Sequence, residues 1–258
     1  MGTMTSIEDS PPKKPENKAD IAYFISDLHL GALYSDLNPE REKILVRFLE
    51  EKAALGQQLF ILGDLFEFWM EYRFYIQKDH FRTLAALGEL VKKGVKVYYL
   101  SGNHDFNLGE FFQKTLGIEV HTKPLSISLQ GKKMLLLHGD GEAKSDWKYR
   151  ILNKIMVHPL ANTCFKWVHP DLGMALARSL SKLSRDQHHN KPRFMEEYEA
   201  ASLNHLRKSG ADILMHGHTH AAFVKTFPEG IYVNCGEWLY DMKYIAMSEG
   251  ICRVESFA

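Results

Sequence analysis

Five short polar segments of this sequence hold the side chains best suited to chemistry. In chain order they are Asp-Leu-His at 27–29, Gly-Asp at 63–64, Gly-Asn-His-Asp at 102–105, His-Gly-Asp at 138–140 and His-Gly-His-Thr-His at 216–220. Carboxylates, amides and imidazoles are poor partners for an apolar core, but divalent cations bind them readily. A metal site assembled from distant parts of the chain is therefore the first hypothesis.

The number and type of these side chains favour two cations over one. A structural zinc takes four ligands, often with Cys among them, whereas these segments supply seven nitrogen or oxygen donors and no Cys. Two divalent cations that share a bridging carboxylate would use all seven, with Mn2+ expected first and Fe or Zn as alternatives. The candidate metal ligands are Asp27, His29, Asp64, Asn103, His138, His216 and His218.

A simpler explanation exists for each segment taken alone. An Asp at the end of a strand is more often a turn former or a helix cap, and a lone His is more often a surface or satisfied core residue. Five such segments, each after a predicted strand and most with an adjoining Gly, make that explanation inadequate for the whole set.

The elements that must position these segments follow an α/β pattern. Apolar runs at 21–25, 58–62 and 95–100 predict buried strands, and they alternate with amphipathic helices at 39–54 and 79–93. This alternation predicts parallel strands in a layered fold, in which ligand sites lie at the carboxyl ends of the strands. The first three polar segments all stand at such ends.

The first polar segment shows how one strand could aim two ligands together. Asp27 and His29 are two residues apart, and on an extended chain their side chains point the same way. Such a pair occurs by chance in many strands, so its meaning depends on the other segments.

The second half of the chain has a different pattern of predicted strands and helices. Two short strands around Gln130-Gly131 predict a tight hairpin, residues 144 to about 207 read as helical, and a strand returns at 211–215, just before the last polar segment. Strand-like runs between 223 and 254 predict a hairpin-rich second sheet. Residues 21–258 are therefore expected to form one domain with a helical insertion.

Composition narrows the class of protein. The formal net charge is +0, which implies no whole-molecule attraction to nucleic acid. Three widely spaced Cys argue against a disulfide framework and fit a reducing, cytoplasmic compartment. Residues 1–20 carry three Pro and several charges without an apolar run, which predicts a disordered tail rather than a signal peptide. No apolar stretch has the length that a membrane-spanning helix needs.

The five segments, in this order, resemble the signature of the calcineurin-like metallophosphoesterase family over residues 21 to about 248. The resemblance implies a four-layer α-β-β-α sandwich, with two sheets packed face to face between helices and a dinuclear centre at one edge. Carried over by motif, the ligands divide into Asp27, His29 and His218 on one cation, Asn103, His138 and His216 on the other, and Asp64 bridging both.

The reaction implied by this resemblance is hydrolysis of a phosphoester. Two neighbouring cations polarise a phosphoryl oxygen and activate water for attack on phosphorus, so no Ser or Cys nucleophile is required. His104 would protonate the leaving oxygen or stabilise its charge, with Asp105 orienting the imidazole. A purely structural role is the alternative for His104, and Asp140 is expected in a turn or supporting role rather than as a ligand.

The helical insertion is expected to cover the metals. Between Lys144 and Arg193 there are ten Lys or Arg and three Asp or Glu, together with many large apolar residues. A cap that buries its own apolar face explains part of this composition. A lid that binds an anionic and lipid-bearing molecule, in peripheral contact with a membrane, is the sharper hypothesis.

A closer resemblance narrows the substrate. Asp-Leu-Phe-Glu-Phe-Trp at 64–69 is similar to the extended second motif of the UDP-2,3-diacylglucosamine pyrophosphohydrolases of lipid A synthesis, and the insertion and chain length are similar too. That group produces UMP and 2,3-diacylglucosamine 1-phosphate on the cytosolic face of the inner membrane. The resemblance implies substrate contacts from Asn103, His104, Asp146, Tyr149 and His216.

One residue of this chain differs from the pattern of that group, and the difference allows other substrates. Better-known members of that group carry Arg where this chain has His104. An Arg only stabilises charge, which suffices for a phosphate leaving group, whereas a His can also protonate a poorer alkoxide leaving group. Another phosphodiester or a phosphomonoester is therefore a second candidate substrate. A non-catalytic interaction module is a third hypothesis, which the full ligand set argues against, and the oligomeric state is left open.

Overall fold

The computed structural model of the chain describes residues 20–32, 38–185, 192–238 and 240–257. The predicted disordered tail at 1–20 lies outside the described residues except for Asp20. None of the helices in these ranges combines the length and the apolar character that crossing a bilayer requires.

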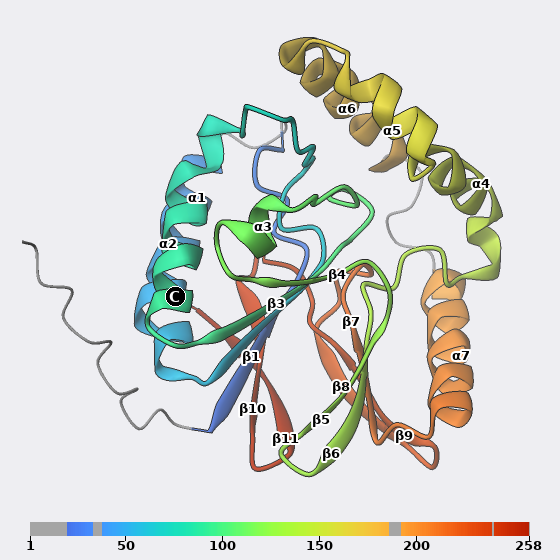
Figure 1. The fold of residues 1–258 in the computed structure, drawn as a ribbon. Coiled ribbons are helices and arrows are strands. Elements are labelled where there is room, and N and C mark those ends of the chain that lie inside the picture. The colour runs from blue at the N-terminus through green and yellow to red at the C-terminus, as the bar shows by residue number, and fades with distance from the viewer. Residues whose placement is uncertain (1–19, 33–37, 186–191, 239, 258) are drawn as a thin grey trace, which may run out of the picture.

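Two β-sheets lie face to face between outer helices, so the predicted four-layer α-β-β-α arrangement is confirmed (Figure 1). The first sheet has the strand order β11-β10-β1-β2-β3-β4. Strands β1 to β4 run parallel, whereas β10 is antiparallel to β1 and pairs with β11. The bounds are β1 (Ile21–Ile25), β2 (Gln58–Leu62), β3 (Lys96–Leu100), β4 (Glu119–His121), β10 (Lys243–Ser248) and β11 (Ile251–Ser256).

The second sheet has the strand order β5-β6-β7-β9-β8, with β6, β7 and β9 parallel. Its bounds are β5 (Leu125–Leu129), β6 (Lys132–Leu136), β7 (Ile213–His216), β8 (Phe223–Phe227) and β9 (Gly230–Asn234). The predicted hairpin is confirmed, because Gln130 and Gly131 both have positive φ, as a two-residue hairpin turn requires. The prediction that all strands after 223 join one sheet is wrong, since β10 and β11 extend the first sheet.

The helices α1 (Asn38–Glu51) and α2 (Phe81–Lys92) cover the outer face of the first sheet, and α7 (Pro192–Ser209) covers the second (Figure 1). Short 3-10 turns occur at η1 (Ala53–Leu55), η2 (Lys78–His80) and η3 (Lys144–Asp146). The one-turn helix α3 (Phe111–Lys114) and the strand β4 were not predicted from the sequence.

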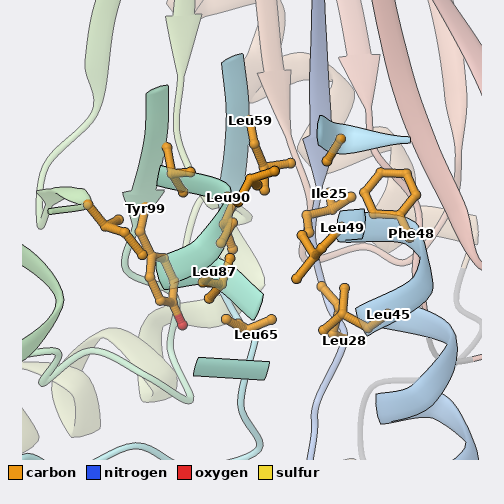
Figure 2. Packing of buried hydrophobic residues seen from close by; sticks show 14 of the residues in the cluster. Ile25, Leu28, Leu45, Phe48, Leu49, Leu59, Leu65, Leu87, Leu90 and Tyr99 are labelled. Atoms are coloured by element: carbon orange, nitrogen blue, oxygen red, sulfur yellow. The ribbon is translucent and has the colours of Figure 1, made fainter. Parts of the chain in front are cut away.

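The largest apolar cluster lies between the first sheet and its two helices (Figure 2). Leu45 and Phe48 of α1 and Leu87 and Leu90 of α2 are spaced by three residues, so each pair lies on one helix face. Both pairs pack in one cluster with Ile25, the last residue of β1. Full burial of such a side chain contributes about 1.5–3 kcal/mol, so this packing fixes where the strand ends and the first polar loop begins.

A second cluster fills the space between the two sheets. Phe24, Phe60 and Tyr98 stand on neighbouring strands and stack in a row, with ring centroids 4.7 Å and 4.6 Å apart. Successive residues of a strand face opposite sides, so Phe24 faces the second sheet while Ile25 faces the helices. The first sheet is therefore buried on both faces, as its continuous apolar runs indicate.

The helices α4 (Trp147–Met156), α5 (Pro159–Lys166) and α6 (Pro170–Arg185) form an arch outside the sandwich (Figure 1). Helix α7, which was predicted to belong to the insertion, instead packs on the second sheet through Leu203 and Leu206 beside Tyr232. The described part of the helical insertion is thus α4 to α6, and α7 is a layer of the core.

Candidate metal centre

The loops after β1, β2 and β3 are joined by hydrogen bonds to a single residue, Asp64. Its carbonyl oxygen accepts hydrogen bonds from the backbone N–H groups of Leu28 and His29, both at 2.9 Å. Its carboxylate Oδ1 accepts one from the backbone N–H of His104, also at 2.9 Å. The carboxyl ends of the three strands therefore bring the first three polar segments to one point.

Asp27, His29 and His220 form the first group of potential metal ligands, with donor atoms within 4.8 Å of one another. The Nε2 atom of His220 lies 3.3 Å from Asp27 Oδ1, and Nε2 of His29 lies 3.8 Å from the same oxygen. Asp27 and His29 are buried, so the three donor atoms converge in a space with little access to water.

Asn103, His138 and His218 form a second group beside the first. Asn103 Oδ1 lies 3.0 Å from Nε2 of His138 and 3.1 Å from Nδ1 of His218. Asp64 belongs to this group as well, because its Oδ2 lies 3.3 Å from His138 Nε2. One amide oxygen, two imidazoles and one carboxylate are a suitable donor set for a divalent cation.

Asp64 lies between the two groups in the position of a bridging ligand. Its Oδ2 is 3.8 Å from Nε2 of His29 and 3.3 Å from Nε2 of His138, one histidine from each group. Its other oxygen is held by the backbone of His104. The structure thus brings together six of the seven predicted ligands. It corrects the place of His218, which was predicted on the first cation with Asp27 and His29 but lies in the second group.

His216, the seventh, faces away from this cluster and its assignment needs correction. It ends β7, and its Nε2 lies 3.2 Å from Ser202 Oγ while its Nδ1 lies 3.2 Å from Asn234 Nδ2. It takes part in none of the ligand groups that the described residues form. Side chains alternate only up to the end of the strand, and the backbone then turns through left-handed conformations at His218 and His220, which direct both rings into the site. The predicted contact of His216 with substrate fails for the same reason.

Backbone strain is concentrated at the candidate ligands. Positive φ is uncommon for residues other than Gly and persists only where the surrounding structure enforces it, often at functional sites. Five of the eight described non-glycine residues with positive φ are candidate ligands. They are Asp27 (55°), His29 (47°), Asp64 (53°), His218 (61°) and His220 (61°). The expectation of an extended backbone at Asp27 and His29 is therefore wrong, although their side chains do converge.

Orphaned polar atoms and close backbone packing support a cation at this place. Nε2 of His29 is buried between the carboxylates of Asp27 and Asp64 and makes no hydrogen bond. A buried polar atom without a partner carries a large cost, which a bound cation would remove. Gly102 leaves room for the bridging carboxylate, since a Cβ at this position would lie 2.2 Å from Asp64 Oδ1.

The charges of the site also suit a cation. Burial raises the pKa of Asp27 and Asp64, but His220 and His138 outweigh burial and hold both pKa values below their usual range. Burial lowers the pKa of His218 to about 3, so its imidazole is neutral at physiological pH. Burial lowers the pKa of His220 and of His138, but Asp27 and Asp64 outweigh burial and raise it, to about 10 for His220. Because ionised carboxylates and neutral imidazoles are the forms that bind metals, these two rings would release a proton when a cation binds.

His104 lies at the rim of the ligand groups, with its side chain 15% exposed. Its Nδ1 lies 2.9 Å from the backbone carbonyl oxygen of Glu67, so this nitrogen is the donor and Nε2 is left to face the site. Burial lowers the pKa of His104, but Asp64 and Glu67 outweigh burial and raise it, which favours the protonated ring.

Asp105 does not orient His104, contrary to the prediction. Its carboxylate accepts backbone hydrogen bonds from Gly102 at 2.7 Å, Leu65 at 2.8 Å and Asp64 at 3.2 Å, and it also accepts the phenol hydrogen of Tyr99. Asp105 is fully buried. It therefore holds together the two loops that carry the bridging carboxylate and Asn103.

Asp146 and Tyr149, predicted to contact substrate, both fasten the start of the insertion. Tyr149 donates to Asp140 Oδ2 at 2.5 Å, which ties α4 to the loop after His138. Asp146 is buried and accepts a hydrogen bond from the hydroxyl of Tyr198 on α7 at 2.9 Å. These contacts place α4 beside the second ligand group.

Two glutamates contact ligand histidines and were not predicted. Glu67 Oε2 lies 3.2 Å from Nδ1 of His29, and Glu237 Oε2 lies 2.7 Å from Nδ1 of His220. Glu67 lies within the conspicuous run at 64–69, but Glu237 lies in a loop after β9 with no motif around it. The sequence carries a signal for the first of them only.

Comparison with known proteins agrees with this geometry. The calcineurin-like phosphoesterase family matches residues 22–222, which contain all five polar segments. A Haemophilus ducreyi protein named UDP-2,3-diacylglucosamine hydrolase is 31% identical over 227 residues, covering 86% of this chain and 94% of that protein. Proteins of the same name are 32% identical over 242 residues in Aeromonas salmonicida (90% and 91% covered) and 34% identical over 164 residues in Porphyromonas gingivalis (63% and 63% covered). The chain therefore belongs to the calcineurin-like phosphoesterase family of metal-dependent hydrolases.

Proposed function

We propose that this protein hydrolyses the pyrophosphate bond of UDP-2,3-diacylglucosamine to give UMP and 2,3-diacylglucosamine 1-phosphate, with Mn2+ as its metal. The observation that carries the proposal is the extent of the likeness to relatives of that name, which reaches 86% of this chain and 94% of the Haemophilus ducreyi protein. That extent includes the insertion as well as the metal centre, so the likeness is not limited to the features that the whole family shares.

The residues of the site have distinct roles in this proposal. One cation would be held by Asp27, His29 and His220, the other by Asn103, His138 and His218, and Asp64 would bridge them. Two bound dications supply Lewis-acid polarisation of the phosphoryl oxygens and a lowered pKa for the attacking water.

His104 would act on the leaving group. With Nδ1 held by the carbonyl of Glu67, its Nε2 is free to donate a hydrogen bond or a proton to the leaving oxygen. Burial lowers the pKa of His104, but Asp64 and Glu67 outweigh burial and raise it, which favours the protonated ring. Because this ring and the ring of His29 lie edge to face with centroids 4.7 Å apart, a leaving oxygen at His104 is also close to the first ligand group.

The insertion supports a substrate with acyl chains. The described side chains of α4 to α6 leave many large apolar groups exposed, among them Ile151, Ile155 and Leu172, and none of the residues of α5 is buried. A cap that serves only to cover itself would bury these groups. Exposed apolar helices next to a phosphoester site suit a ligand that is anionic at one end and apolar at the other. We therefore assign α4 to α6 the role of a lid, and Asp146 and Tyr149 that of residues that set its position at the substrate.

Peripheral contact with the cytosolic face of a membrane is part of the same proposal, because the substrate is a lipid. Trp167 at the end of α5 is 87% exposed, and Phe74 and Tyr75 in the loop before α2 are 78% and 70% exposed. Aromatic side chains in such positions favour the headgroup region of a bilayer. Flotation with vesicles of lipids from the inner membrane should recover the wild-type protein and less of a Trp167→Ser variant. Equal recovery of the two would exclude Trp167 from the contact.

Another phosphodiester or a phosphomonoester is the second candidate substrate, and His104 favours it. An alkoxide leaving group needs a proton, whereas a phosphate leaving group does not. The position of His104 beside the ligand groups suits either reaction.

Assays on two substrates separate the candidates. Protein loaded with Mn2+, Fe or Zn is incubated with UDP-2,3-diacylglucosamine and, separately, with an aryl phosphodiester, and UMP and aryl alcohol are measured. UMP release from the first substrate supports the proposal, and turnover of the second substrate alone overturns it in favour of the second candidate. An Asp64→Ala variant should lose both metals and all turnover. If the loaded wild-type protein turns over neither substrate, a non-catalytic interaction module is the better description.

A further inference from the structure

The two ligand groups differ in what supports their histidines. In the first group, both histidines contact a carboxylate through Nδ1, His29 with Glu67 at 3.2 Å and His220 with Glu237 at 2.7 Å. In each case Nε2 is the nitrogen nearest to Asp27, at 3.8 Å and 3.3 Å. Both rings therefore present Nε2 to the cation position and Nδ1 to a glutamate.

In the second group, the support of His138 is a neutral backbone oxygen. Nδ1 of His138 lies 2.7 Å from the backbone carbonyl oxygen of Leu62. Nδ1 of His218 lies 3.1 Å from Oδ1 of Asn103, which is itself a candidate ligand, so this nitrogen is one of the donor atoms that converge on the cation position. The carbonyl of Leu62 fixes the ring of His138, but it adds no net negative charge. The carboxylate of Asp64 lies close to this group, and it is shared with the first group.

This difference changes how strongly each group binds a cation. A carboxylate at Nδ1 fixes the proton there, leaves the Nε2 lone pair for the metal and makes the imidazole a stronger donor. It also adds a negative charge close to the cation in a buried site, where screening by water is weak. Glu67 is 5% exposed, and the Glu237 side chain is 18% exposed.

We propose that Glu67 and Glu237 are positioning residues that make the group of Asp27, His29 and His220 the tighter of two unequal cation sites. The other site, of Asn103, His138 and His218, then binds its cation more weakly and exchanges it more readily. The inference rests on the metal dependence in the proposed function, and it concerns residues that do not touch the cation themselves.

The backbone of Glu67 adds a link to the leaving-group histidine. Its carbonyl oxygen lies 2.9 Å from Nδ1 of His104, while Oε2 of its side chain lies 3.2 Å from Nδ1 of His29. A Glu67→Gln substitution removes the charge and keeps the backbone contact. Its effect on metal binding can therefore be measured without displacing His104.

The test is a Mn2+ titration of the full chain after removal of metal by a chelator, with free Mn2+ followed by its electron paramagnetic resonance signal. The wild-type protein should bind one Mn2+ at least about 10-fold more tightly than the second, because an outer carboxylate of this kind changes metal affinity by about 10–100-fold. Glu237→Gln and Glu67→Gln should each weaken the tight class by about 10–100-fold and leave the weak class unchanged.

Ligand variants assign the two classes, and a matched pair gives the control. His220→Ala should remove the tight class, whereas His218→Ala should remove the weak class. Glu119→Gln breaks a glutamate–histidine contact of the same kind, with His121 at 2.8 Å on the exposed surface of β4, and should change neither class. The melting temperatures of the metal-free glutamine variants should equal that of the metal-free wild type, which a merely structural role would not allow.

Each result decides the matter. Two equal classes in the wild type, weakening of both classes together in the glutamine variants, or no weakening at all would overturn the inference. Loss of the tight class in His218→Ala would overturn it as well. If one glutamine variant does not fold, the other gives the same test. Two unequal classes with the expected response, in a protein that releases no UMP, would support the inference while the proposed substrate fails.

Discussion

Replacing Asp105 separates two roles for this residue, one predicted from the sequence and one from the structure. The sequence motif predicts that Asp105 orients His104, whereas the structure shows its carboxylate accepting backbone hydrogen bonds from Gly102, Leu65 and Asp64. We therefore expect Asp105→Ala to destabilise the fold and to disturb both metals, because the loop that carries Asp64 loses its anchor.

The magnitude follows from the donors that lose their partner. Each buried N–H group left unpaired costs about 1–3 kcal/mol, so three of them predict a loss of at least about 3 kcal/mol in the free energy of unfolding. This loss is a large part of the free energy of unfolding of a typical domain, which is about 5–15 kcal/mol. Burial and the nearby Asp64 raise the pKa of Asp105 to about 6, so the comparison belongs at pH 7.5, where the side chain is ionised.

Urea unfolding followed by tryptophan fluorescence measures this loss, and metal analysis measures the second effect. Asp212→Ala is the matched control, since Asp212 is exposed and accepts one backbone hydrogen bond, from Lys133 at 2.8 Å. It should cost about 1 kcal/mol or less. If Asp105→Ala costs no more than this control and keeps two metals while kcat falls, Asp105 acts on His104 and the reasoning from the structure is wrong. Should Asp105→Ala fail to fold, Asp105→Asn gives an intermediate case.

Three further predictions concern the leaving group, the thiols and the metals. His104→Gln should lower kcat by about 10²–10⁴-fold, as loss of a general acid does, with the metal content unchanged; loss of metal would make His104 a structural residue. Cys164 is exposed and should react with a thiol reagent in the native protein. Cys235 is buried, and burial raises the pKa of its thiol well above the usual value, so Cys235 should react only after urea unfolds the chain. Equal rates would contradict the burial of Cys235. Chelation should lower the melting temperature, because the buried carboxylates of Asp27 and Asp64 then lose the positive charge of the cations. Mn2+ at 100 times its Kd should add about 2.7 kcal/mol per site; an unchanged melting temperature would argue against tight binding.

The strands that carry the site could be predicted because their apolar runs end abruptly. The predicted bounds at 21–25 and 58–62 match β1 and β2 residue for residue. Strand β4 has three residues, half-buried or exposed, and so has no periodic pattern to detect. The sheet that β10 joins depends on contacts with β1 far away in the sequence, which no local pattern contains.

The site residues could be predicted by type but not by direction. The sequence pattern predicts Asp27 and His29 at alternate positions of an extended chain, yet the backbone at Asp27, His29 and His220 is left-handed. In the last motif that difference exchanges His216 for His220. The roles of Glu67 and Glu237 could not be predicted for the same reason. Each contacts Nδ1 of a ligand histidine, and the position of that nitrogen depends on the orientation of the ring.

The left-handed backbone at the ligands depends on buried hydrogen bonds, among them those of Asp105. Left-handed backbone at residues with side chains is unfavourable, so such loops hold their shape only if other contacts enforce it. Asp105 supplies those contacts for the loop of Asp64, and the Asp64 carbonyl supplies them for the loop of His29. Because each loop is held by the next, the donor atoms are in place before a cation arrives. Binding then needs little rearrangement of the protein, and the free energy of metal binding is not consumed in ordering the loops.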